Sequence, residues 1–460
     1  MGVAFGFVGN YAPRGLSPQT DGMPVILKKR LEKNPIEECN WIQQKYYPEL
    51  FEKFRQALDP RHQGYIDYNI EVMLGTLYYK NIAGISSMRG MTDAFNDDAV
   101  VENISRYLNV EGMDFLPHAQ TLNEFLERLD TSVLEEIRKD MVRKMIRRKT
   151  FDDARFQEKW LIIVDGTELD EGNIKKNDGY LKREYNKGKD NAKVKYHNSV
   201  LEAKIWFGND LVCSIETEPI ENPDGYYDNT DEKMKQDCES KAFKRLAKKL
   251  KQDFPRLPVC LLMDGLYVST PVLDICDENG WSYLIRYKEG CAPSIEKEYQ
   301  LIPEKNTSDG CEYINQVIFR DRDVNVLKYT ETRIEDGEEV QTDFAWVTCM
   351  EITDKNAKKM ADAGRGRWKI ENQGFNRQKN WNGNIEHMCS WNENAQKNHY
   401  LMAQIADFIR QLYEFFYLKK NEIIKTHKKI SSDLLNSIAG LFRNTSEDIT
   451  NQELNESVLS

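Results

Sequence analysis

The sequence contains no Cys-x-x-Cys pair, although nine cysteines are scattered along its 460 residues. Zinc sites need closely spaced ligands, and disulfide frameworks are typical of small secreted domains, so this spacing argues against both. Several of the cysteines, such as Cys213, Cys260 and Cys349, lie in apolar runs that resemble strands. We therefore expect reduced structural thiols and no zinc site.

Long apolar runs are also missing. None approaches the roughly 18 residues that a membrane-spanning helix needs. The first residues lack the basic-then-apolar pattern of a signal peptide, and we find no internal repeat and no low-complexity tract. We expect a soluble intracellular protein without a membrane partner.

The composition is that of an ordinary globular protein, with 40% hydrophobic and 30% charged residues. A chain of 460 residues can bury a sizeable core and suggests two or three structural units. The net charge of -11 argues weakly against a nucleic-acid partner, because phosphate binding relies on Lys and Arg. A local basic face remains compatible with this charge.

Residues 1–158 are predicted to be helical. Apolar residues recur there at three- and four-residue spacing in Trp41–Leu58, Tyr68–Tyr79 and Thr121–Lys149. The basic run Arg138–Lys149 fits either a solvated helix face or a face that contacts phosphates.

The pattern changes to strands at Trp160. The apolar runs 160–164 and 259–263 are each followed by Asp-Gly, at Asp165 and Asp264. Such a run indicates a buried strand whose carboxylate emerges at the C-terminal edge, where open sheets present their ligands. The other elements that we expect in this region are hairpin strands at 199–207 and 211–217 around Gly208-Asn209-Asp210, an amphipathic helix at 231–253 and a strand at 281–287.

A β-rich insertion is predicted at 290–345, followed by helices that complete a mixed α+β fold. Its strands are expected at 313–319, 324–334 and 340–350, with a hairpin at Asp336-Gly337. A helix at 354–380 then carries Glu371, and a long helix at 392–420 has one apolar stripe.

Three elements together resemble the DDE transposases of bacterial insertion sequences. They are Asp165-Gly-Thr167, Asp264-Gly265 and the helix Arg367-Trp-Lys-Ile-Glu371, and the likeness covers Trp160 to Tyr417. The resemblance is to the group whose ribonuclease H-like core, also called retroviral integrase-like, has a β-strand insertion before the last acidic residue. It implies a helical N-terminal DNA-binding and assembly domain (1–158), a catalytic domain (159–289 and 346–425), the β insertion (290–345) and a C-terminal tail (426–460).

The helix around Glu371 departs from the family signature. That signature runs Tyr, two residues, Arg, three residues, Glu, six residues, Lys. Arg367 and Glu371 fit, but the Tyr position is Gly364 and the Lys position is Gln378. Lys379 follows one residue later, about 100° further round an ideal helix, so either residue 378 or residue 379 remains open as the one that takes the lysine's role.

The resemblance implies a metal-dependent endonuclease and strand-transfer enzyme. It would bind the inverted-repeat ends of an insertion sequence, cleave the DNA and join the freed strand to target DNA. Asp165, Asp264 and Glu371 would be catalytic and would hold two Mg²⁺ ions, with Asp165 bridging them and Mn²⁺ able to substitute. Two such ions, roughly 3.5–4 Å apart, activate the attacking oxygen and stabilise the leaving oxygen, and Mg²⁺ accepts carboxylates together with substrate phosphates.

Basic residues supply candidate contacts to double-stranded DNA, both the transposon ends and the target. Those between 175 and 195 fit either a solvated loop or a phosphate-binding loop with interleaved tyrosines. His197 fits a structural hydrogen bond or a phosphate contact, and Trp346 a core residue or a base-stacking one. The DNA-binding candidates are Arg367, Lys379, Lys182, Arg183, Lys193, Lys195, His197, Arg286 and Lys288.

Pairing of two ends implies a homodimer in the synaptic complex, in the bacterial cytoplasm and on the nucleoid when DNA is bound. One alternative keeps the fold but makes the chain a transposase-derived DNA-binding protein or a nuclease that no longer mobilises an element. A second alternative is an interaction protein in which the carboxylates are incidental.

Overall fold

The computed structural model describes residues 34–222, 236–287, 290, 292–335 and 338–442. A ten-stranded sheet runs through this part of the chain in the order β2-β3-β1-β5-β6-β10-β9-β8-β7, and β4 pairs with β3. The strands of its first half are β1 Trp160–Gly172, β2 Leu181–Tyr185, β3 Lys193–Trp206, β4 Val212–Ile220, β5 Val259–Met263 and β6 Ser282–Arg286.

The centre of the sheet has ribonuclease H-like topology. Strand β1 pairs antiparallel with β3 and parallel with β5, β5 pairs parallel with β6, and β3 pairs antiparallel with β4. In the order β4-β3-β1-β5-β6, the strands β4, β3 and β1 are therefore antiparallel to one another, and β1, β5 and β6 are parallel. The turn between β3 and β4 also forms as predicted, with positive φ at Gly208 and Asn209.

The β insertion extends the same sheet. It contains α11 Pro293–Leu301 and four strands, of which β10 pairs antiparallel with β6 from Trp346↔Arg286 to Thr348↔Leu284. Its strands are β7 Asn306–Ser308, β8 Cys311–Phe319, β9 Arg322–Glu335 and β10 Glu338–Thr348. The last three match the predicted strands, and the hairpin residues 336 and 337 lie outside the described residues.

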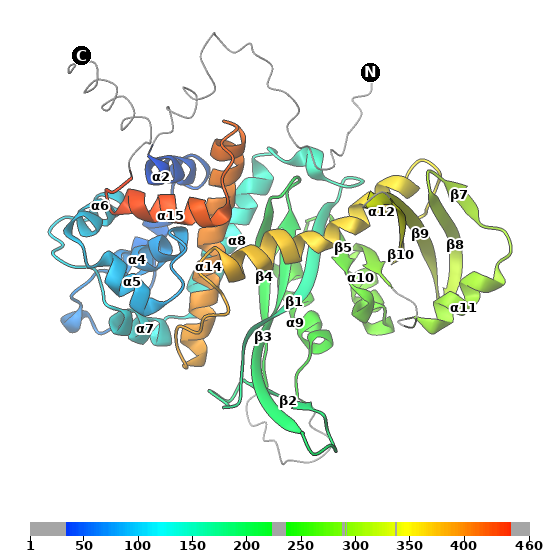
Figure 1. Cartoon of the computed structure of the whole chain (residues 1–460), viewed down its shortest axis with the longest axis horizontal. Helices are drawn as coiled ribbons and strands as arrows, with labels where there is room; N and C mark the ends of the chain where they lie inside the picture. The colour runs from blue at the N-terminus through cyan, green and yellow to red at the C-terminus, as the bar shows by residue number, and fades with distance from the viewer. Residues whose placement is uncertain (1–33, 223–235, 288–289, 291, 336–337, 443–460) are drawn as a thin grey trace, which may run out of the picture.

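Helices gather on one side of the core sheet, beyond the long helix α14, Glu393–Tyr413 (Figure 1). Two predicted helices are each divided in two, because Pro48 lies between α2 and α3 and Asp130 caps the start of α8. The helices before the sheet are α2 Pro35–Tyr46, α3 Leu50–Gln56, α4 Ile70–Ile82, α5 Met88–Phe95, α6 Asp98–Leu108, α7 Ala119–Arg128 and α8 Thr131–Arg147.

The C-terminal range 426–460 contributes one described helix, α15 His427–Ile438. It packs on α2 and α6, with Ile430, Leu434 and Ile438 buried. Helix α15 lies within the range that we predicted to be a C-terminal tail. It packs with the N-terminal helices on the helical side of the molecule (Figure 1).

Two apolar clusters lie on opposite faces of the core sheet. Ile162 and Val164 of β1 face the cluster that includes the N-terminal helices and α9, Glu239–Asp253. Leu161 and Ile163 face the other cluster, which includes α12, Ala357–Arg365. This alternation is the two-residue period of a strand buried on both faces. The described start of α9 is later than the predicted helix start, and residues 231–235 lie outside the described part of the chain.

The predicted helix at 354–380 is helical but irregular. It runs through α12, the 3₁₀ turn η4 (Gly366–Trp368), the π-helical segment η5 (Ile370–Phe375) and α13 (Asn376–Asn380). Glu371 lies in the π-helical segment. Single π-helical turns within α-helices are frequent at functional sites.

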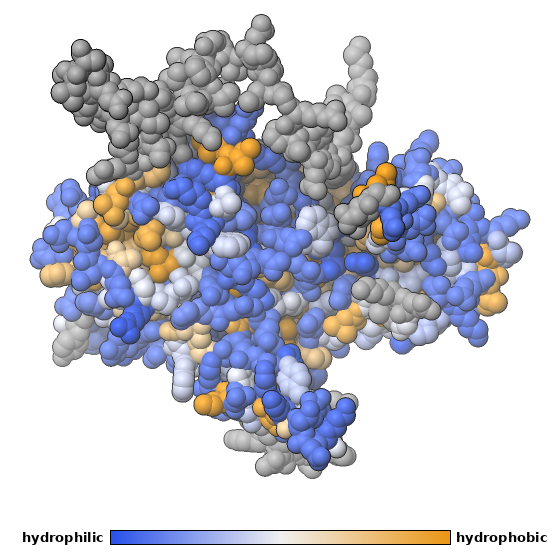
Figure 2. Space-filling view, in the orientation of Figure 1, coloured by the Kyte–Doolittle hydropathy of each residue, from blue (hydrophilic) through white to orange (hydrophobic). Residues whose placement is uncertain are grey.

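The surface in the view of Figure 2 is mainly hydrophilic, with apolar residues in small separate patches. In the part of the chain that the structure describes, no helix has the length and apolar character to cross a membrane.

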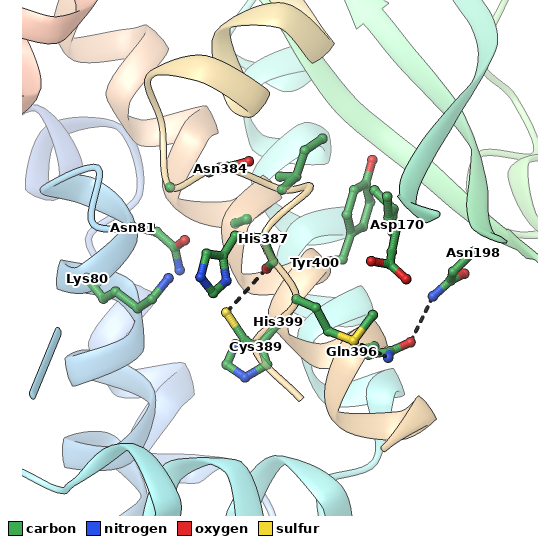
Figure 3. Close-up of a pocket in the computed structure, with 15 residues that line it drawn as sticks. Lys80, Asn81, Asp170, Asn198, Asn384, His387, Cys389, Gln396, His399 and Tyr400 are labelled. Atoms are coloured by element: carbon green, nitrogen blue, oxygen red, sulfur yellow. Dashed lines mark hydrogen bonds between the residues drawn. The ribbon is translucent and has the colours of Figure 1, made fainter. Parts of the chain in front are cut away.

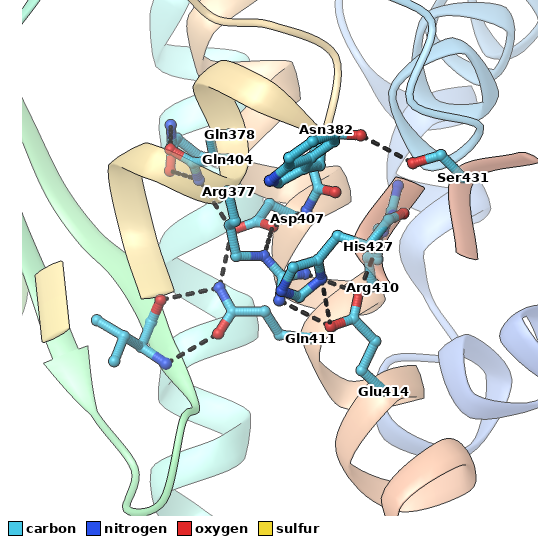
Figure 4. Close-up of polar contacts among 12 residues, drawn as sticks. Arg377, Gln378, Asn382, Gln404, Asp407, Arg410, Gln411, Glu414, His427 and Ser431 are labelled. Atoms are coloured by element: carbon cyan, nitrogen blue, oxygen red, sulfur yellow. Dashed lines mark hydrogen bonds and ion pairs between the residues drawn. The ribbon is translucent and has the colours of Figure 1, made fainter. Parts of the chain in front are cut away.

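A buried polar network fixes α13 to α14 (Figure 4). The Asp407 carboxylate accepts hydrogen bonds from Arg377 Nε at 3.1 Å and from the side-chain amides of Gln378, Asn382 and Gln411, each at 2.8 Å. Burial alone would raise the pKa of Asp407, but the charges of Arg377 and Lys204 together with these amide donors hold it below its usual range.

Replacing Asp407 with Ala should lower the free energy of unfolding by about 3–5 kcal/mol, because it removes one of the two carboxylates that pair with the buried Arg377 guanidinium and leaves three buried amide donors without their acceptor. Urea denaturation followed by circular dichroism measures this loss. Asp93→Ala, at an exposed position of α5, is the control and should change stability by less than about 0.5 kcal/mol. A loss within about 1 kcal/mol for Asp407→Ala would contradict this role.

Candidate active site

Asp165 continues the row of β1 side chains that faces α12. Leu161 and Ile163 precede it on that face and are fully buried or nearly so. Its Oδ1 accepts the Gly166 backbone N–H at 3.0 Å, and its Oδ2 accepts Arg367 Nη1 at 3.0 Å. The predicted emergence of this carboxylate at the end of a buried apolar run is therefore what the structure shows.

Asp264 follows directly after β5, the parallel neighbour of β1. The register pairs Ile163 with Leu262, and its continuation places Asp264 beside Asp165. Asp264 caps the 3₁₀ turn η3 (Gly265–Tyr267), since its Oδ1 accepts the Leu266 N–H at 2.9 Å. The two aspartates therefore share one edge of the sheet.

Arg367 joins Glu371 to this edge. Its Nη2 donates to Glu371 Oε1 at 2.7 Å, while its Nη1 donates to Asp165 Oδ2. The four-residue spacing between Arg367 and Glu371 gives the shared helix face that the sequence predicted. One guanidinium thus bridges carboxylates from a strand and from a helix that are about two hundred residues apart in the chain.

The crowding of carboxylates changes the acidity of Asp165. Burial is the largest cause and raises its pKa to about 6, and Arg367 opposes this shift. The nearby charges of Glu371, Asp264 and Glu239 raise it further. Perturbed carboxyl groups that cluster in this way are frequent at functional sites.

Glu239, the first residue of α9, is a fourth carboxylate at this edge that the sequence reasoning missed. Its Oε2 accepts the Tyr267 hydroxyl at 3.2 Å. A methyl group placed on Gly166 would lie 2.6 Å from Glu239 Oε1, so the carboxylate fills the space beside that glycine. Burial and the Asp264 charge raise the pKa of Glu239, while the hydrogen bond from Tyr267 lowers it. In the sequence, Glu239 is only a glutamate in a helix that comes before a strand ending at Asp-Gly. This pattern is too common to identify a site.

The donor set suits a hard divalent cation, because carboxylate oxygens are the ligands that Mg²⁺ and Mn²⁺ prefer. Within the described ranges, however, no three His, Cys, Asp or Glu side chains lie close enough to hold one ion together. Arg367 supplies the positive charge between Asp165 and Glu371 in this arrangement. The residue types therefore fit a metal in chemistry, but in this arrangement their side chains do not surround one ion.

Gly364 occupies the position where the family signature has Tyr, and the structure gives the reason. A methyl group on Gly364 would lie 2.4 Å from Trp346 Nε1, and one on Gly366 would lie 2.3 Å from the Trp206 ring. These glycines let the helix lie directly on the sheet. Trp346 itself is fully buried and stacks on Phe344, with ring centroids 5.9 Å apart. It is therefore a core residue, and the base-stacking interpretation is wrong.

Residues 378 and 379 differ sharply in environment. Gln378 is fully buried and donates to Gln404 and Asp407. Lys379 is more accessible and pairs with Glu386 at 2.6 Å. A π-helical turn accommodates one residue more than an α-helical turn, and η5 lies between Glu371 and Lys379. This places the lysine one position later than a regular helix would.

The basic stretch predicted as a loop with few acids is instead a two-stranded ribbon of β2 and the start of β3. Glu168, Asp170 and Glu171 lie in β1 beside it. Arg183 pairs with Glu168 and Glu171, and Lys195 pairs with Glu171 at 2.5 Å. Lys182 pairs with Glu184 at 3.1 Å, and Lys193 is exposed at the start of β3. Arg183, Lys195 and Lys182 therefore face acidic partners that the sequence did not indicate.

His197 and Arg286 lie in different settings. His197 is buried, its Nδ1 lies 3.1 Å from Ser199 Oγ, and burial lowers its pKa, which favours the structural interpretation. Arg286 ends β6 and stacks over the Phe344 ring at 5.0 Å. Burial and the Arg367 charge lower its pKa, so Arg286 belongs to the same neighbourhood as Arg367 and Glu371. Lys288 lies outside the described residues.

A separate cavity of about 60 Å³ lies between α4, the end of β1 and the segment after α13 (Figure 3). It is lined by Lys80, Asp170, His387, Cys389 and His399, among others. Its volume suits a few water molecules, and none of the predicted site residues lines it. It is therefore not the carboxylate site.

Part of the chain is similar to a known protein family. Residues 236–406 match the family model for the transposase DDE domain, a range that contains Asp264, Arg367 and Glu371 and begins after Asp165. Among solved structures, a cryo-EM structure of a piggyBac transposase synaptic complex with hairpin DNA is similar, with 12% sequence identity and a TM-score of 0.41. The alignment covers 89% of this chain and 81% of that one. No curated protein matches the chain. Residues 236–406, less than half of the chain, are therefore similar to the DDE domain of transposases.

Proposed function

We propose that the protein is a transposase that binds the inverted-repeat ends of an insertion sequence, cleaves the DNA and transfers the strand to target DNA. The observation that carries the proposal is the bridge from Arg367 to both Asp165 and Glu371, with Asp264 directly after β5, the parallel neighbour of β1. The match of residues 236–406 to the transposase DDE domain supports it. An incidental cluster of acidic residues gives no reason for an arginine that pairs with one carboxylate on a strand and another on a helix.

Asp165, Asp264 and Glu371 would hold two divalent cations, Mg²⁺ or Mn²⁺, with Asp165 shared between them. When bound, such a pair activates the attacking oxygen and stabilises the leaving oxygen of a phosphodiester. The protein would hold the three carboxylates at one edge of the sheet. In the absence of the cations, Arg367 supplies the positive charge beside Asp165 and Glu371. A DNA phosphate would give Arg367 a new partner and free both carboxylates for the cations.

Contacts to DNA would come from cations around this edge. Arg286, Arg367 and Lys379 lie on elements that converge on Glu371, and Lys193 is exposed on the ribbon. Lys182, Arg183 and Lys195 would contact phosphates only by exchanging their present acidic partners. The helical region 1–158 would recognise the ends and assemble a homodimer around two of them, with 159–289 and 346–425 as the catalytic domain in the bacterial cytoplasm and nucleoid.

Asp165→Asn and Glu371→Gln should each lower cleavage of the DNA that flanks the gene by at least about a hundredfold, since each removes a few kcal/mol of transition-state stabilisation. Purified protein with Mg²⁺ and that DNA, followed on a denaturing gel, measures the rate. Asp93→Asn, on the exposed face of α5, is the control and should cleave at the wild-type rate. Wild-type rates for both variants would overturn the site, and DNA binding without cleavage by the wild-type protein would favour the transposase-derived binding protein.

Lys379→Ala should weaken DNA binding and reduce the salt dependence of log K by about one counterion, because one phosphate contact is lost. Its stability should change by less than about 0.5 kcal/mol. Gln378→Ala should instead cost about 1–3 kcal/mol of stability, because it leaves Gln404 and Asp407 short of a donor. Fluorescence anisotropy at several salt concentrations and urea denaturation separate the two. The reverse pattern would assign the role to residue 378.

The metal-free protein should lose stability as the pH rises through about 6, relative to Asp165→Asn. The folded-state pKa of Asp165, about 6, lies above its unfolded value of about 3.8, so protonation favours the folded state. The advantage is complete below pH 4 and is lost between pH 4 and 6, amounting to about 3 kcal/mol for a shift of two units. Urea denaturation in EDTA at pH 4 to 8 measures it. A pH-independent difference between the two proteins would show that Asp165 is not in this crowded setting.

A further inference from the structure

We propose that the cavity beside Lys80 is a binding site for a small inorganic oxyanion of the size of phosphate, held by the Lys80 ammonium (Figure 3). This site is separate from the carboxylates of the sheet edge and does not depend on the proposed function. Three features carry it: the burial of Lys80, the lack of a partner for Lys80 among the described residues, and the polar cavity beside its side chain.

Lys80 lies in a helix that has no exposed face. Every residue of α4, from Ile70 to Ile82, is buried, and Lys80 is only 2% exposed. Lysine is almost never fully buried in a protein unless its charge is paired. The other charged residue of this helix, Glu71, pairs with Arg55 at 3.6 Å. In α4, Lys80 is therefore the residue that needs a counter-charge.

The protein supplies no such charge within the ranges that the structure describes. The Lys80 ammonium forms no hydrogen bond and no ion pair there. Burial lowers its pKa, and the Cys389 thiol is the group whose charge would raise it. Because burial also raises the pKa of that thiol, Cys389 stays uncharged at neutral pH and does not act as the counter-ion. A buried ammonium without a counter-ion is strongly disfavoured, and a bound anion would supply the missing charge.

The cavity beside Lys80 is small and has polar walls. Its volume is about 60 Å³, whereas pockets for drug-sized ligands measure about 300–1,000 Å³. Lys80, Asn81 and His387 lie together at one end of it, and Asp170 and Asn198 lie at the other end (Figure 3). The cavity therefore has room for an ion of a few atoms and not for a nucleotide, and the Lys80 end carries hydrogen-bond donors beside the ammonium.

Asp170 is the single carboxylate among the described residues that line the cavity, and its charge is already paired. Both of its oxygens accept from Lys176 Nζ at 2.8 Å, and the Tyr180 hydroxyl donates to Oδ2 at 3.0 Å. Its charge is not among those that shift the pKa of Lys80. At the other end, burial and the Lys80 charge lower the pKa of His399 to about 3. The potential beside Lys80 is therefore positive, which favours an anion over a cation.

An anion at Lys80 would join parts of the molecule that are far apart in the sequence. Lys80 belongs to the helical region, whereas other walls of the cavity come from the segment between α13 and α14 and from α14 itself. That segment approaches α4 closely at Gly383, where a methyl group would lie 2.8 Å from Asn81 Oδ1. Because these walls come together only in the folded protein, a bound anion should stabilise the fold.

The test is isothermal titration calorimetry of the full-length protein with sodium phosphate at neutral pH. The wild type should bind one phosphate per chain, and about 10 mM phosphate should raise its melting temperature by at least about 2 °C relative to sodium chloride of equal ionic strength. Lys80→Met, which keeps the aliphatic stem, should bind phosphate at least about tenfold more weakly. Its melting temperature without phosphate should be unchanged or higher, because an unpaired buried charge is removed.

Asn384→Asp is a second variant, which adds a negative charge to the cavity wall and leaves Lys80 in place. The φ of residue 384 is 52°, a conformation that Asp also adopts, so the fold should tolerate the change. It should also weaken phosphate binding by at least about tenfold. Lys244→Met, at an exposed position of α9, is the matched control and should bind phosphate as the wild type does.

Two results would overturn the inference. If the wild type does not bind phosphate, or if Lys80→Met binds it as tightly as the wild type, Lys80 is a buried amine without an anion. If Lys80→Met instead loses affinity for DNA while its phosphate affinity is unchanged, Lys80 contacts the DNA backbone and the cavity is not an anion site. Should Lys80→Met fail to fold, Asn384→Asp decides: wild-type phosphate affinity in that variant overturns the site, and a tenfold loss supports it.

Discussion

The position of Glu371 depends on a buried carboxylate that is far from it in sequence, Asp407 of α14. Four donors converge on Asp407, and two of them, Arg377 and Gln378, belong to the helical turn that follows the Glu371 segment. Arg377 also forms a two-pronged pair with Glu414, which in turn pairs with Arg410. Arg410 donates to the carbonyls of Ile82 in α4 and His427 in α15. Buried ion pairs of this kind contribute little net stability but strongly disfavour alternative packings that would leave a charge unpaired. The helical part of the molecule therefore sets the place of the helix that carries Glu371.

A second constraint acts from the sheet, through residues that have no side chain. Gly364 and Gly366 lie against Trp346 and Trp206, and Gly374 lies against the aliphatic part of Lys204. The helix can approach the sheet closely only at these points, and this approach lets Arg367 reach Asp165. The same contact explains why a tyrosine cannot occupy position 364. Departure from the family signature is here a consequence of packing, and the arginine and the glutamate that the chemistry needs are both retained.

The sequence predicted the parts of the fold that follow from local pattern. Apolar runs ending in Asp-Gly identified β1 and β5, and Gly208-Asn209 identified a hairpin turn, because both signals are contained in a few adjacent residues. The ribbon of β2 and β3 was missed because its strands are mostly charged and are stabilised by cross-strand pairs such as Lys195 with Glu171. Glu239 was missed because its relation to Asp165 exists only after α9 has packed on β3 and β4. The π-helical turn at Glu371 could not be seen either, because no residue type specifies it, and it changes which of residues 378 and 379 is accessible.

Charge pairing within the chain resolves the apparent conflict between a net charge of -11 and a DNA partner. The cations near the carboxylate edge are already paired: Arg367 with Asp165 and Glu371, Lys379 with Glu386, and Arg183 with Glu168. The Lys379 and Arg183 pairs can exchange their carboxylates for a phosphate at little electrostatic cost, because a partially exposed ion pair is worth only about 0–1 kcal/mol. The Arg367–Asp165 pair is mostly buried, so its exchange costs more. For Arg367 the exchange has a second effect, since the carboxylates it releases are those that would take up divalent cations. DNA binding and metal binding at this edge would then favour one another. The phosphate would pair with Arg367, and the cations would bind the carboxylates of Asp165 and Glu371 that Arg367 releases.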